Sequence, residues 1–385
     1  MSSKTKLGTT MGLISVMLAF FAMGIIDIIG IASNYIKNDF ALSDTTIGTF
    51  SFILFTSFLV LSIPTSALMN KIGQRKTVIV SIIIMCMALS MICFYYNMVG
   101  VALFYVLLGV GITMIQVGFS PLIASIVDKK YLSTTLTLGQ LTKAAGSAII
   151  PLAAAWASLK YGDWRVVLPA VIGFSILVVL LLFFTPIKED EPKKALSFGQ
   201  SFSLLKNPFL LFAFIAMLCH VGVDVGMAIY SPRLLVERAG VTVEASTFTN
   251  TVYFICRTAG CFIGTLCLSF ISNRKFFHIS MAITLVGIVG LLFTHSTTLI
   301  YIFIGLVAMG NSNVYPIMVS KCMMNHPDNK NEISAIMVMG LFGGGIFPLI
   351  MGIVNDSVNT QAGGVVVLII ATIVMTLWGI MWRKD

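Results

Sequence analysis

Long apolar runs recur along the whole chain, and they restrict its fold more than any other feature of the sequence. An α-helix needs about 20 apolar residues to cross the hydrocarbon core of a bilayer. Twelve such runs occur, at 10–36, 45–69, 77–95, 99–127, 133–159, 164–186, 208–235, 245–272, 276–294, 297–321, 333–355 and 361–382. The sequence lacks the short alternating segments of a membrane β-barrel. It therefore predicts an all-α membrane protein with twelve transmembrane helices.

The composition agrees with a chain embedded in lipid. Hydrophobic residues make up 58% of the 385 residues and charged residues only 10%, whereas soluble domains carry about 25% charged residues. The net charge of +9 is attributed to basic residues that flank membrane helices, and not to nucleic-acid binding. The seven cysteines form no CxxC or Cys/His cluster, so we expect no metal, no cofactor and no disulfide framework.

Lysine and arginine are unevenly distributed among the predicted loops. When both termini are placed in the cytoplasm, 17 of the 24 basic residues fall in inside segments and 5 in outside loops. Cytoplasmic loops of membrane proteins carry an excess of these residues. We therefore expect an integral protein of the plasma (inner) membrane with both termini cytoplasmic.

The longest polar segment divides the apolar runs into two groups of six. We expect an N-terminal six-helix bundle at 1–186, a cytoplasmic linker at 187–207 and a C-terminal six-helix bundle at 208–385. The linker contains proline, serine and charged residues, which is typical of a connection between two separately packed bundles.

Two sequence motifs recur in corresponding places of the two halves. GSAIIPL (Gly146–Leu152) matches GGGIFPL (Gly343–Leu349), and MGIID, ending at Asp27, matches HVGVD, ending at Asp224. We expect the glycines and prolines to weaken these helices or to let neighbouring helices approach closely. A parallel internal repeat is typical of secondary transporters, in which the substrate binds between pseudo-symmetric halves near the bilayer midplane.

Four ionisable residues besides histidine lie deep in the predicted helices: Asp27, Lys143, Asp224 and Arg257. A charge at this depth costs about 2.5 kcal/mol or more unless it is paired or faces water. The two acids are candidate proton-coupling residues, or else structural partners of a base. Lys143 is a candidate substrate ligand, and Arg257, which stays protonated, a candidate fixed counter-ion. His220, one turn before Asp224, is a candidate proton relay or donates to a carbonyl group; which acid pairs with which base stays open.

Uncharged polar residues in the predicted helices suit a solute that forms hydrogen bonds. Gln140 lies three residues before Lys143 and so on the same helical face. The alternative is that such groups join helices, at about 1 kcal/mol per bond. The candidate substrate-binding residues besides Lys143 are Gln116, Gln140, Asn313, Tyr315 and Asn34.

The loop SALMNKIGQRK (Ser66–Lys76) resembles the signature loop of the major facilitator superfamily, with Ser66 in place of its first glycine. The resemblance implies the major facilitator fold, with two pseudo-symmetric six-helix bundles. It also implies that the loop latches neighbouring helices in the outward-open state. The residues that fit the pattern are Asn70, Lys71, Gly73, Arg75 and Lys76.

Within that superfamily, the chain resembles the fucose–galactose–glucose:proton symporters over most of its length. FFAMGIIDIIGIASNYI resembles their first helix, whose aspartate, at the place of Asp27, takes part in proton coupling. CRTAG resembles their eighth helix, including the arginine at Arg257. The chain departs from their pattern at Gln116, where a glutamate is usual, and at Lys143, where a sugar-binding asparagine stands.

These observations predict a secondary transporter and not an enzyme, since the sequence offers no nucleophile triad, metal-ligand spacing or phosphate-binding loop. The expected activity is alternating-access transport of a small polar solute with protons, by symport. A sugar, an acidic sugar and a small organic anion all fit. An exporter or exchanger is the alternative, because GSAIIPLAAA resembles a degraded antiporter motif. The expected partners are solute, protons and lipid, and we expect a monomer.

Overall fold

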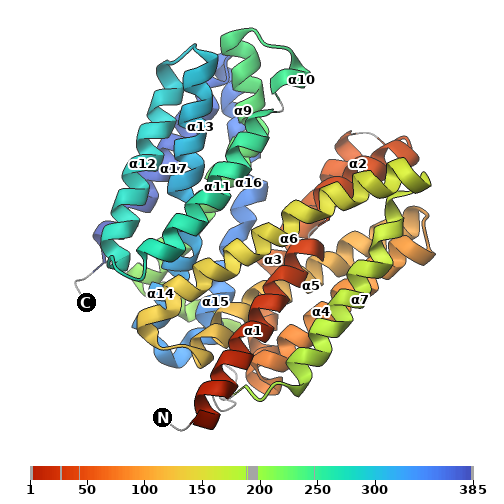
Figure 1. The fold of residues 1–385 in the computed structure, drawn as a ribbon. Coiled ribbons are helices and arrows are strands. Elements are labelled where there is room, and N and C mark those ends of the chain that lie inside the picture. Colours follow the sequence, from red (N-terminus) through yellow and green to blue (C-terminus); the bar gives the residue numbers. More distant parts are fainter. Residues whose placement is uncertain are drawn as a thin grey trace. The chain divides into compact units, whose positions relative to one another are not determined.

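The computed structural model describes residues 3–26, 28–42, 44–187, 189, 198–246 and 248–382. These residues form α-helices and short 3-10 helices but no strand (Figure 1). They divide into two compact units. Unit 1 comprises Met1–Ser201 with Pro327–Val338, and unit 2 comprises Phe202–His326 with Met339–Asp385.

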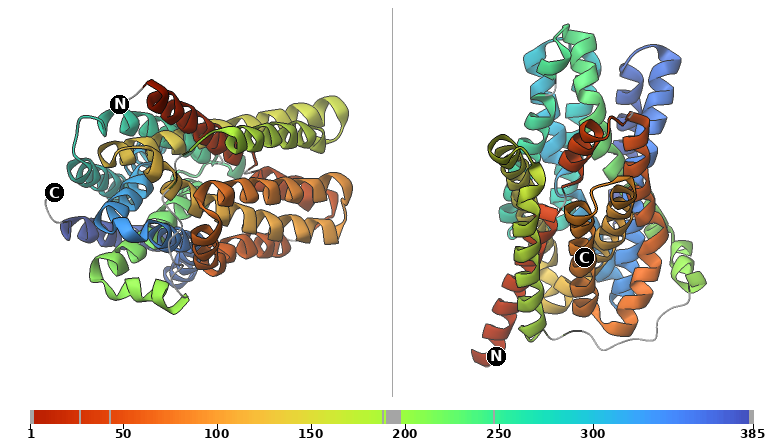
Figure 2. Two further views of the ribbon diagram at one scale, coloured as in Figure 1. Left: turned by 90° about the horizontal axis from the view of Figure 1, so that it is seen from below. Right: turned by 90° about the vertical axis from the view of Figure 1, so that its right-hand side faces the viewer.

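Unit 1 is a bundle in which α1 packs against α6 and α7, and α5 packs against α3 and α4 (Figures 1 and 2). Its helices are α1 (Ser3–Ile26), α2 (Ile29–Asp39), α3 (Asp44–Ile72), α4 (Gln74–Phe94), α5 (Met98–Ile126), α6 (Leu132–Tyr161), α7 (Leu168–Phe184) and α15 (Lys330–Met339), whose last residue belongs to unit 2.

Unit 2 is a second bundle, in which α9 packs against α16 and α17, and α13 packs against α11 and α12 (Figure 1). Its helices are α9 (Pro208–Ala239), α10 (Val243–Ser246), α11 (Phe248–Cys267), α12 (Asn273–Phe293), α13 (Thr297–Asn311), α14 (Val314–Asn325), α16 (Gly343–Val358) and α17 (Ala362–Ile380). The short helix α8 (Phe198–Ser203) crosses the boundary between the units along the chain.

Short polar signals in the sequence set the helix ends. The Asn97 side chain accepts a hydrogen bond from the Gly100 amide at the start of α5, and Asn207 does the same for Phe209 at the start of α9. Such N-caps satisfy backbone donors that have no partner inside the helix. Gly162 ends α6 with φ 73°, a left-handed conformation that favours glycine.

Nine helical spans in the described part of the chain are long and apolar enough to cross a membrane. Each coincides with one of the twelve predicted spans, and the twelve-helix count stays a prediction. The three predicted spans outside this set are 10–36, 133–159 and 245–272. They hold Asp27, Lys143 and Arg257, whereas the span that holds Asp224 is among the nine.

Three predicted spans are interrupted near their middle. In the first, α1 ends at Ile26 and α2 begins at Ile29. In the tenth, α13 and α14 are separated by Ser312 and Asn313, and in the eleventh a 3-10 turn, Gly340–Phe342, separates α15 from α16. The interruption of the eleventh span directly precedes the glycines predicted to weaken it. In contrast, α6 continues without a break through Pro151, where the sequence predicted a similar weakness.

The repeated motifs make the same backbone contact in each unit. A Cβ atom on Gly146 of α6 would lie 2.6 Å from the carbonyl oxygen of Phe21 in α1. A Cβ atom on Gly343 of α16 would lie 2.1 Å from the carbonyl oxygen of Leu218 in α9. Phe21 and Leu218 each stand six residues before the matching aspartate, Asp27 or Asp224. The internal repeat in the sequence is therefore also a repeat in packing.

A charged and aromatic cluster fixes the connection between α6 and α7. The Arg165 side chain bonds both carboxylate oxygens of Asp163, at 2.7–3.0 Å, and lies 4.1 Å from the centre of the Tyr96 ring. The hydrogen bonds from Arg165 lower the pKa of Asp163 below its usual value. Tyr96 in turn donates to Asp39, at the end of α2. The second half of the first span, α2, is thus attached to Tyr96, and through Tyr96 to the connection between α6 and α7.

Candidate functional site

Asp224 and Arg257 form an ion pair between α9 and α11 in unit 2. Nη2 of Arg257 lies 2.8 Å from Oδ2 of Asp224. The Asp224 side chain is only 14% exposed, whereas that of Arg257 is 34% exposed. The pairing of Asp224, which the sequence left open, is therefore with Arg257, and each residue compensates the charge of the other.

The second carboxylate oxygen of Asp224 is bound from the buried side. The Tyr253 hydroxyl donates to Oδ1 of Asp224 at 2.5 Å, and the Tyr253 side chain is fully buried. Tyr253 lies one turn before Arg257 on α11, so both residues reach the same carboxylate. Asp224 is thus held by a charged donor on one oxygen and a neutral donor on the other.

A chain of polar groups continues from Tyr253 into the interior of unit 2. Asn311, at the end of α13, lies within hydrogen-bond reach of the Tyr253 hydroxyl. Its Oδ1 lies 2.9 Å from Nδ1 of His220, and its Nδ2 donates to the His220 carbonyl oxygen at 3.2 Å. An amide oxygen can only accept, so Nδ1 of His220 carries the proton. We define His220, Asp224, Tyr253, Arg257 and Asn311 as the polar network of unit 2.

The candidate residues of unit 1 lie on α5 and α6. Lys143 and Gln140 are half-buried on α6, and Gln116 is buried on α5. In the described residues, Oε1 of Gln116 has no hydrogen-bond partner. Buried polar atoms are usually hydrogen-bonded, so this oxygen can accept a hydrogen bond from a solute. Asp27 and the Asn34 side chain lie outside the described residues.

Asn313 and Tyr315 lie at the interruption between α13 and α14. The Asn313 side chain donates to the Gly260 carbonyl oxygen of α11 and to the Ser312 hydroxyl, both at 2.8 Å. Asn313 therefore joins α11 to the interrupted helix, the packing role that the sequence left open for it. Tyr315 is buried on α14. A role in substrate binding stays a prediction for both residues.

The signature loop between α3 and α4 has a defined structure in unit 1. Gly73 has φ 94°, which explains why glycine occupies this position. The Arg75 amide donates to Glu189 at 2.9 Å, and its guanidinium donates to the Thr185 carbonyl oxygen at 2.5 Å. Lys71 and Lys76 are exposed.

The same loop binds the segment Pro327–Val338, which belongs to unit 1. Nδ2 of Asn70 donates to Oε1 of Glu332 at 2.6 Å, and Nδ2 of Asn331 donates to Oδ1 of Asn70 at 2.5 Å. Gln74 donates to Asn331 at 3.1 Å. Because Glu332 is buried, Asn70 is the donor that satisfies this carboxylate in the described structure.

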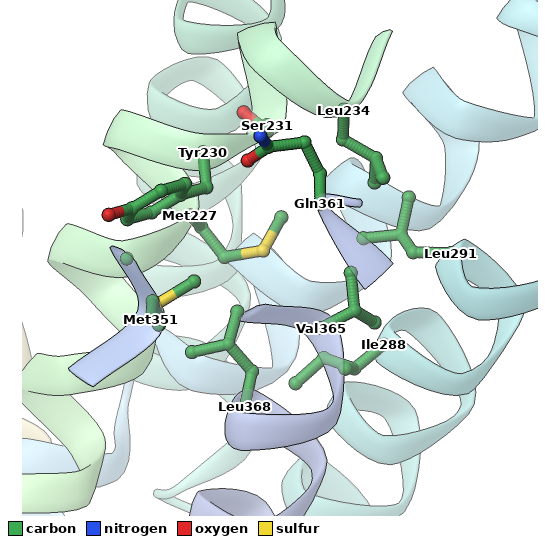
Figure 3. Close-up of a pocket in the computed structure, with 11 residues that line it drawn as sticks. Met227, Tyr230, Ser231, Leu234, Ile288, Leu291, Met351, Gln361, Val365 and Leu368 are labelled. Atoms are coloured by element: carbon green, nitrogen blue, oxygen red, sulfur yellow. The ribbon is translucent and has the colours of Figure 1, made fainter. Parts of the chain in front are cut away.

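Unit 2 also contains a small cavity, lined by α9, α12, α16 and α17 (Figure 3). Its volume of about 10 Å³ accommodates about one water molecule. Met227, Tyr230 and Ser231 of α9 line it, together with Gln361. Ser231 is buried, and its hydroxyl has no partner among the described residues. The cavity is too small for a sugar, so it is not a substrate site.

Several residues of these networks were not predicted from the sequence. Tyr253 was missed because a tyrosine in an apolar run is most often a core residue, although its position four residues before Arg257 placed both on one face. Glu332 and Glu189 lie at predicted helix ends, where acidic residues are common. Only contacts between elements distant in the sequence reveal their partners.

Charged and polar groups that bind one another inside apolar helical spans are typical of membrane transporters. The family model of the Major Facilitator Superfamily matches residues 12–382. The chain therefore belongs to the major facilitator superfamily, and it is an integral membrane transporter, not an enzyme.

Curated relatives are similar over nearly the whole chain. A protein of Brucella abortus biovar 1 (strain 9-941), named glucose/galactose transporter, is 24% identical over 369 residues, which cover 90% of this chain and 88% of the relative. A Helicobacter pylori (strain J99) protein, named putative glucose/galactose transporter, is 22% identical over 380 residues, covering 91% and 90%.

Solved structures share the fold. FucP, a major facilitator transporter in the outward conformation, superposes with a TM-score of 0.86 at 18% identity, covering 98% of this chain and 100% of FucP. The human organic anion transporter MFSD10 superposes with a TM-score of 0.72 at 11% identity, covering 99% and 100%. These likenesses establish the major facilitator fold.

Proposed function

We propose that this protein takes up a sugar together with protons across the plasma membrane. The observation that carries the proposal is the buried ion pair of Asp224 and Arg257, in a chain similar to glucose/galactose transporters over 90% of its length. The structural likeness to FucP, described as a fucose:proton symporter of E. coli, supports the coupling to protons.

Asp27 and Asp224 are proposed as the two acids of this transport cycle. Asp27 takes up the proton when the first span is open to one side, and its protonation removes a buried charge and permits closure of the loaded carrier. Asp224 is paired with Arg257. His220, one turn away on α9, relays protons between buried groups. Arg257 remains charged throughout and is the counter-ion of Asp224 before the solute binds.

The solute is proposed to bind to polar side chains from both halves of the sequence. Gln116 supports this role because its buried amide oxygen has no partner in the described residues. Lys143 adds a cation on α6, next to Gln140 on the same helical face. The remaining candidates are Asn34, Asn313 and Tyr315.

The proposal is tested with purified protein in sealed vesicles. An inward proton gradient should drive accumulation of a labelled sugar, with glucose, galactose, fucose and sugar acids offered separately. Collapse of the gradient with a protonophore should abolish accumulation and leave exchange of internal for external sugar. Exchange without any effect of the gradient would favour the exchanger alternative, and no flux of any sugar would reject the proposal.

A further inference from the structure

Arg257 lies on the face of α11 that packs into unit 2. Tyr253, Gly260 and Gly264 share this face and are buried. The exposed apolar residues Ile255 and Leu266 lie on the opposite side, and the exposed Phe254 lies about one turn before Arg257. Since a guanidinium facing lipid tails is costly, we expect the exposed third of the Arg257 side chain to face water or solute.

The two oxygens of Asp224 are held unequally. Oδ1 is bound by the fully buried Tyr253, whereas Oδ2 is bound by the partly exposed Arg257. A solute can therefore approach the guanidinium without displacing Tyr253. Among the described residues, the charged or titratable groups around Asp224 are Arg257, Tyr253 and the buried Cys261 from α11 and His220 from α9, and Asn311 of α13 is the neutral group behind them.

We propose that Arg257 binds the carboxylate of an acidic sugar, and that this carboxylate replaces Asp224 as the partner of the guanidinium. This inference rests on the proposed function and specifies its substrate class. A carboxylate matches the planar fork of arginine with two parallel hydrogen bonds. The hydroxyl groups of a neutral hexose carry no charge and compete poorly with Asp224.

The exchange couples solute binding to a proton. When Arg257 turns to the solute, the N–H···O contact to Oδ2 of Asp224 breaks and an equivalent contact to the solute forms. Asp224 is then a buried carboxylate without a cation, a state that is strongly unfavourable. One proton from the adjacent aqueous phase binds Asp224 and restores neutrality, while Tyr253 stays hydrogen-bonded to the carboxyl group. The proton on Asp224 balances the charge of the solute carboxylate. The proton on Asp27 moves with them, so one acid moves with two protons and one net positive charge.

Wild-type protein in sealed vesicles tests this inference directly. Labelled glucuronate, galacturonate and gluconate are compared with glucose and galactose, under a pH gradient or a membrane potential alone. We expect at least tenfold faster uptake of a sugar acid than of its neutral counterpart, driven by the pH gradient and also by a membrane potential that is negative inside. Proton-coupled uptake of neutral hexose that sugar acids do not inhibit would overturn the inference and leave the proposed function standing. Absence of uptake of every sugar would reject both.

Variants locate the effect at one residue. Arg257→Gln should reduce sugar-acid uptake about 100-fold, and Arg257→Lys should restore part of it, because lysine keeps the charge without the planar fork. Arg233→Gln is the matched control, because Arg233 is an exposed arginine of α9 that packs on the Tyr230 ring. Normal sugar-acid uptake by folded Arg257→Gln would overturn the inference. If this variant does not fold, the selectivity of the wild-type protein for sugar acids over neutral sugars decides.

Discussion

At the scale of residues, the main finding is that the charges predicted inside the membrane are not equivalent. Asp224 has a cation and a phenol as partners, both from α11. Asp27 occupies the matching place in the sequence repeat and lacks any counterpart of Arg257 in the matching motif. We therefore expect Asp224 to take up a proton only when the solute displaces it from Arg257, and Asp27 to take up a proton without the loss of such a partner.

Removal of the Tyr253 hydroxyl should weaken unit 2. Tyr253→Phe removes one hydrogen bond to a charged group, which contributes about 1.5–3 kcal/mol. We expect a decrease of that size in the free energy of unfolding, measured by denaturation in detergent. Tyr301→Phe, on α13, is the control, since Tyr301 packs against Phe248 through its ring. Equal stability of the two variants would contradict a role of the Tyr253 hydroxyl.

Replacement of Asp27 should separate exchange from accumulation. Asp27→Asn leaves a neutral side chain of similar size that cannot carry a proton. We expect a lower accumulation of sugar in a proton gradient, because only the proton on Asp224 is left to drive it, with exchange of labelled for unlabelled sugar retained. The measurement is paired uptake and counterflow in the same vesicles. Accumulation at the wild-type level would exclude Asp27 as the proton carrier.

The sequence was informative about residues whose burial costs much free energy. Buried charges must be compensated, so the presence of an ion pair was predictable, but its two members were not. Hydrogen-bond partners such as Asn311 of His220 depend on the rotation of each helix about its axis. An apolar helix of low amphipathicity leaves that rotation undetermined until it is packed.

At the scale of elements, two close helix contacts organise the units. Gly146 brings α6 onto α1, and Gly343 brings α16 onto α9. The glycine that began the antiporter-like motif thus has a packing explanation. The repeat was visible in the sequence because close backbone contact admits few residue types. The helix interruptions at Ser312 and at Gly340–Phe342 were less predictable, since no proline stands at either position.

Addition of a methyl group at these contacts should destabilise the fold. In Gly146→Ala, the new Cβ would meet the Phe21 carbonyl oxygen at 2.6 Å, and such overpacking costs about 1–3 kcal/mol. Gly173→Ala in α7 is the control, because nothing lies within 4 Å of its Cβ position. The control should be neutral or up to about 1 kcal/mol more stable, since alanine favours helix. Thermal unfolding measures the stability of both variants, and we expect only Gly146→Ala to lower the unfolding temperature. Equal changes of the unfolding temperature in the two variants would contradict a close contact at Gly146.

The stabilisation that Asp163 and Arg165 give to the α6–α7 connection should change with pH only at acidic pH. Arg165 lowers the pKa of Asp163 in the folded protein, so the stabilisation is complete above the unfolded pKa, about 3.9. It is lost as the pH falls through the lower, folded pKa. Asp163→Asn should therefore reduce stability equally at pH 6 and pH 8, by on the order of 0.2–1 kcal/mol for a surface pair. The measurement is the free energy of unfolding of variant and wild type at both pH values. A difference in stability that changes between pH 6 and pH 8 would contradict a pKa of Asp163 below its usual value.

At the scale of the whole molecule, the superfamily and the helical class followed from the apolar runs and the signature loop. The sequence did not predict that the boundary between the two units falls inside the eleventh predicted span. Val338 belongs to unit 1 and Met339 to unit 2, next to the 3-10 turn Gly340–Phe342. Contacts of Asn331 and Glu332 with the signature loop attach the first part of this span to unit 1. No local pattern in the sequence marks such a long-range attachment.

The predicted topology can be checked with reporter fusions. A reporter active only in the cytoplasm should be active when fused after Lys130 or Lys206 and inactive after Lys160. The basis is the excess of basic residues in the predicted inside segments. A reporter active only outside the membrane should give the reverse pattern, and agreement of the two reporters at any one site would contradict the topology.

The charge of Lys143 inside the span 133–159 has a consequence for biogenesis. A charged residue at the centre of a helix adds about 2.5–3.5 kcal/mol to the free energy of insertion by the translocon. The span 133–159, with Lys143, is followed at once by Trp164–Phe184, whose mean hydropathy of 3.0 is the highest of the nine described spans. A nascent chain ending near Tyr161 should leave its last segment outside the bilayer, and synthesis through Phe184 should draw the two segments in together as a hairpin.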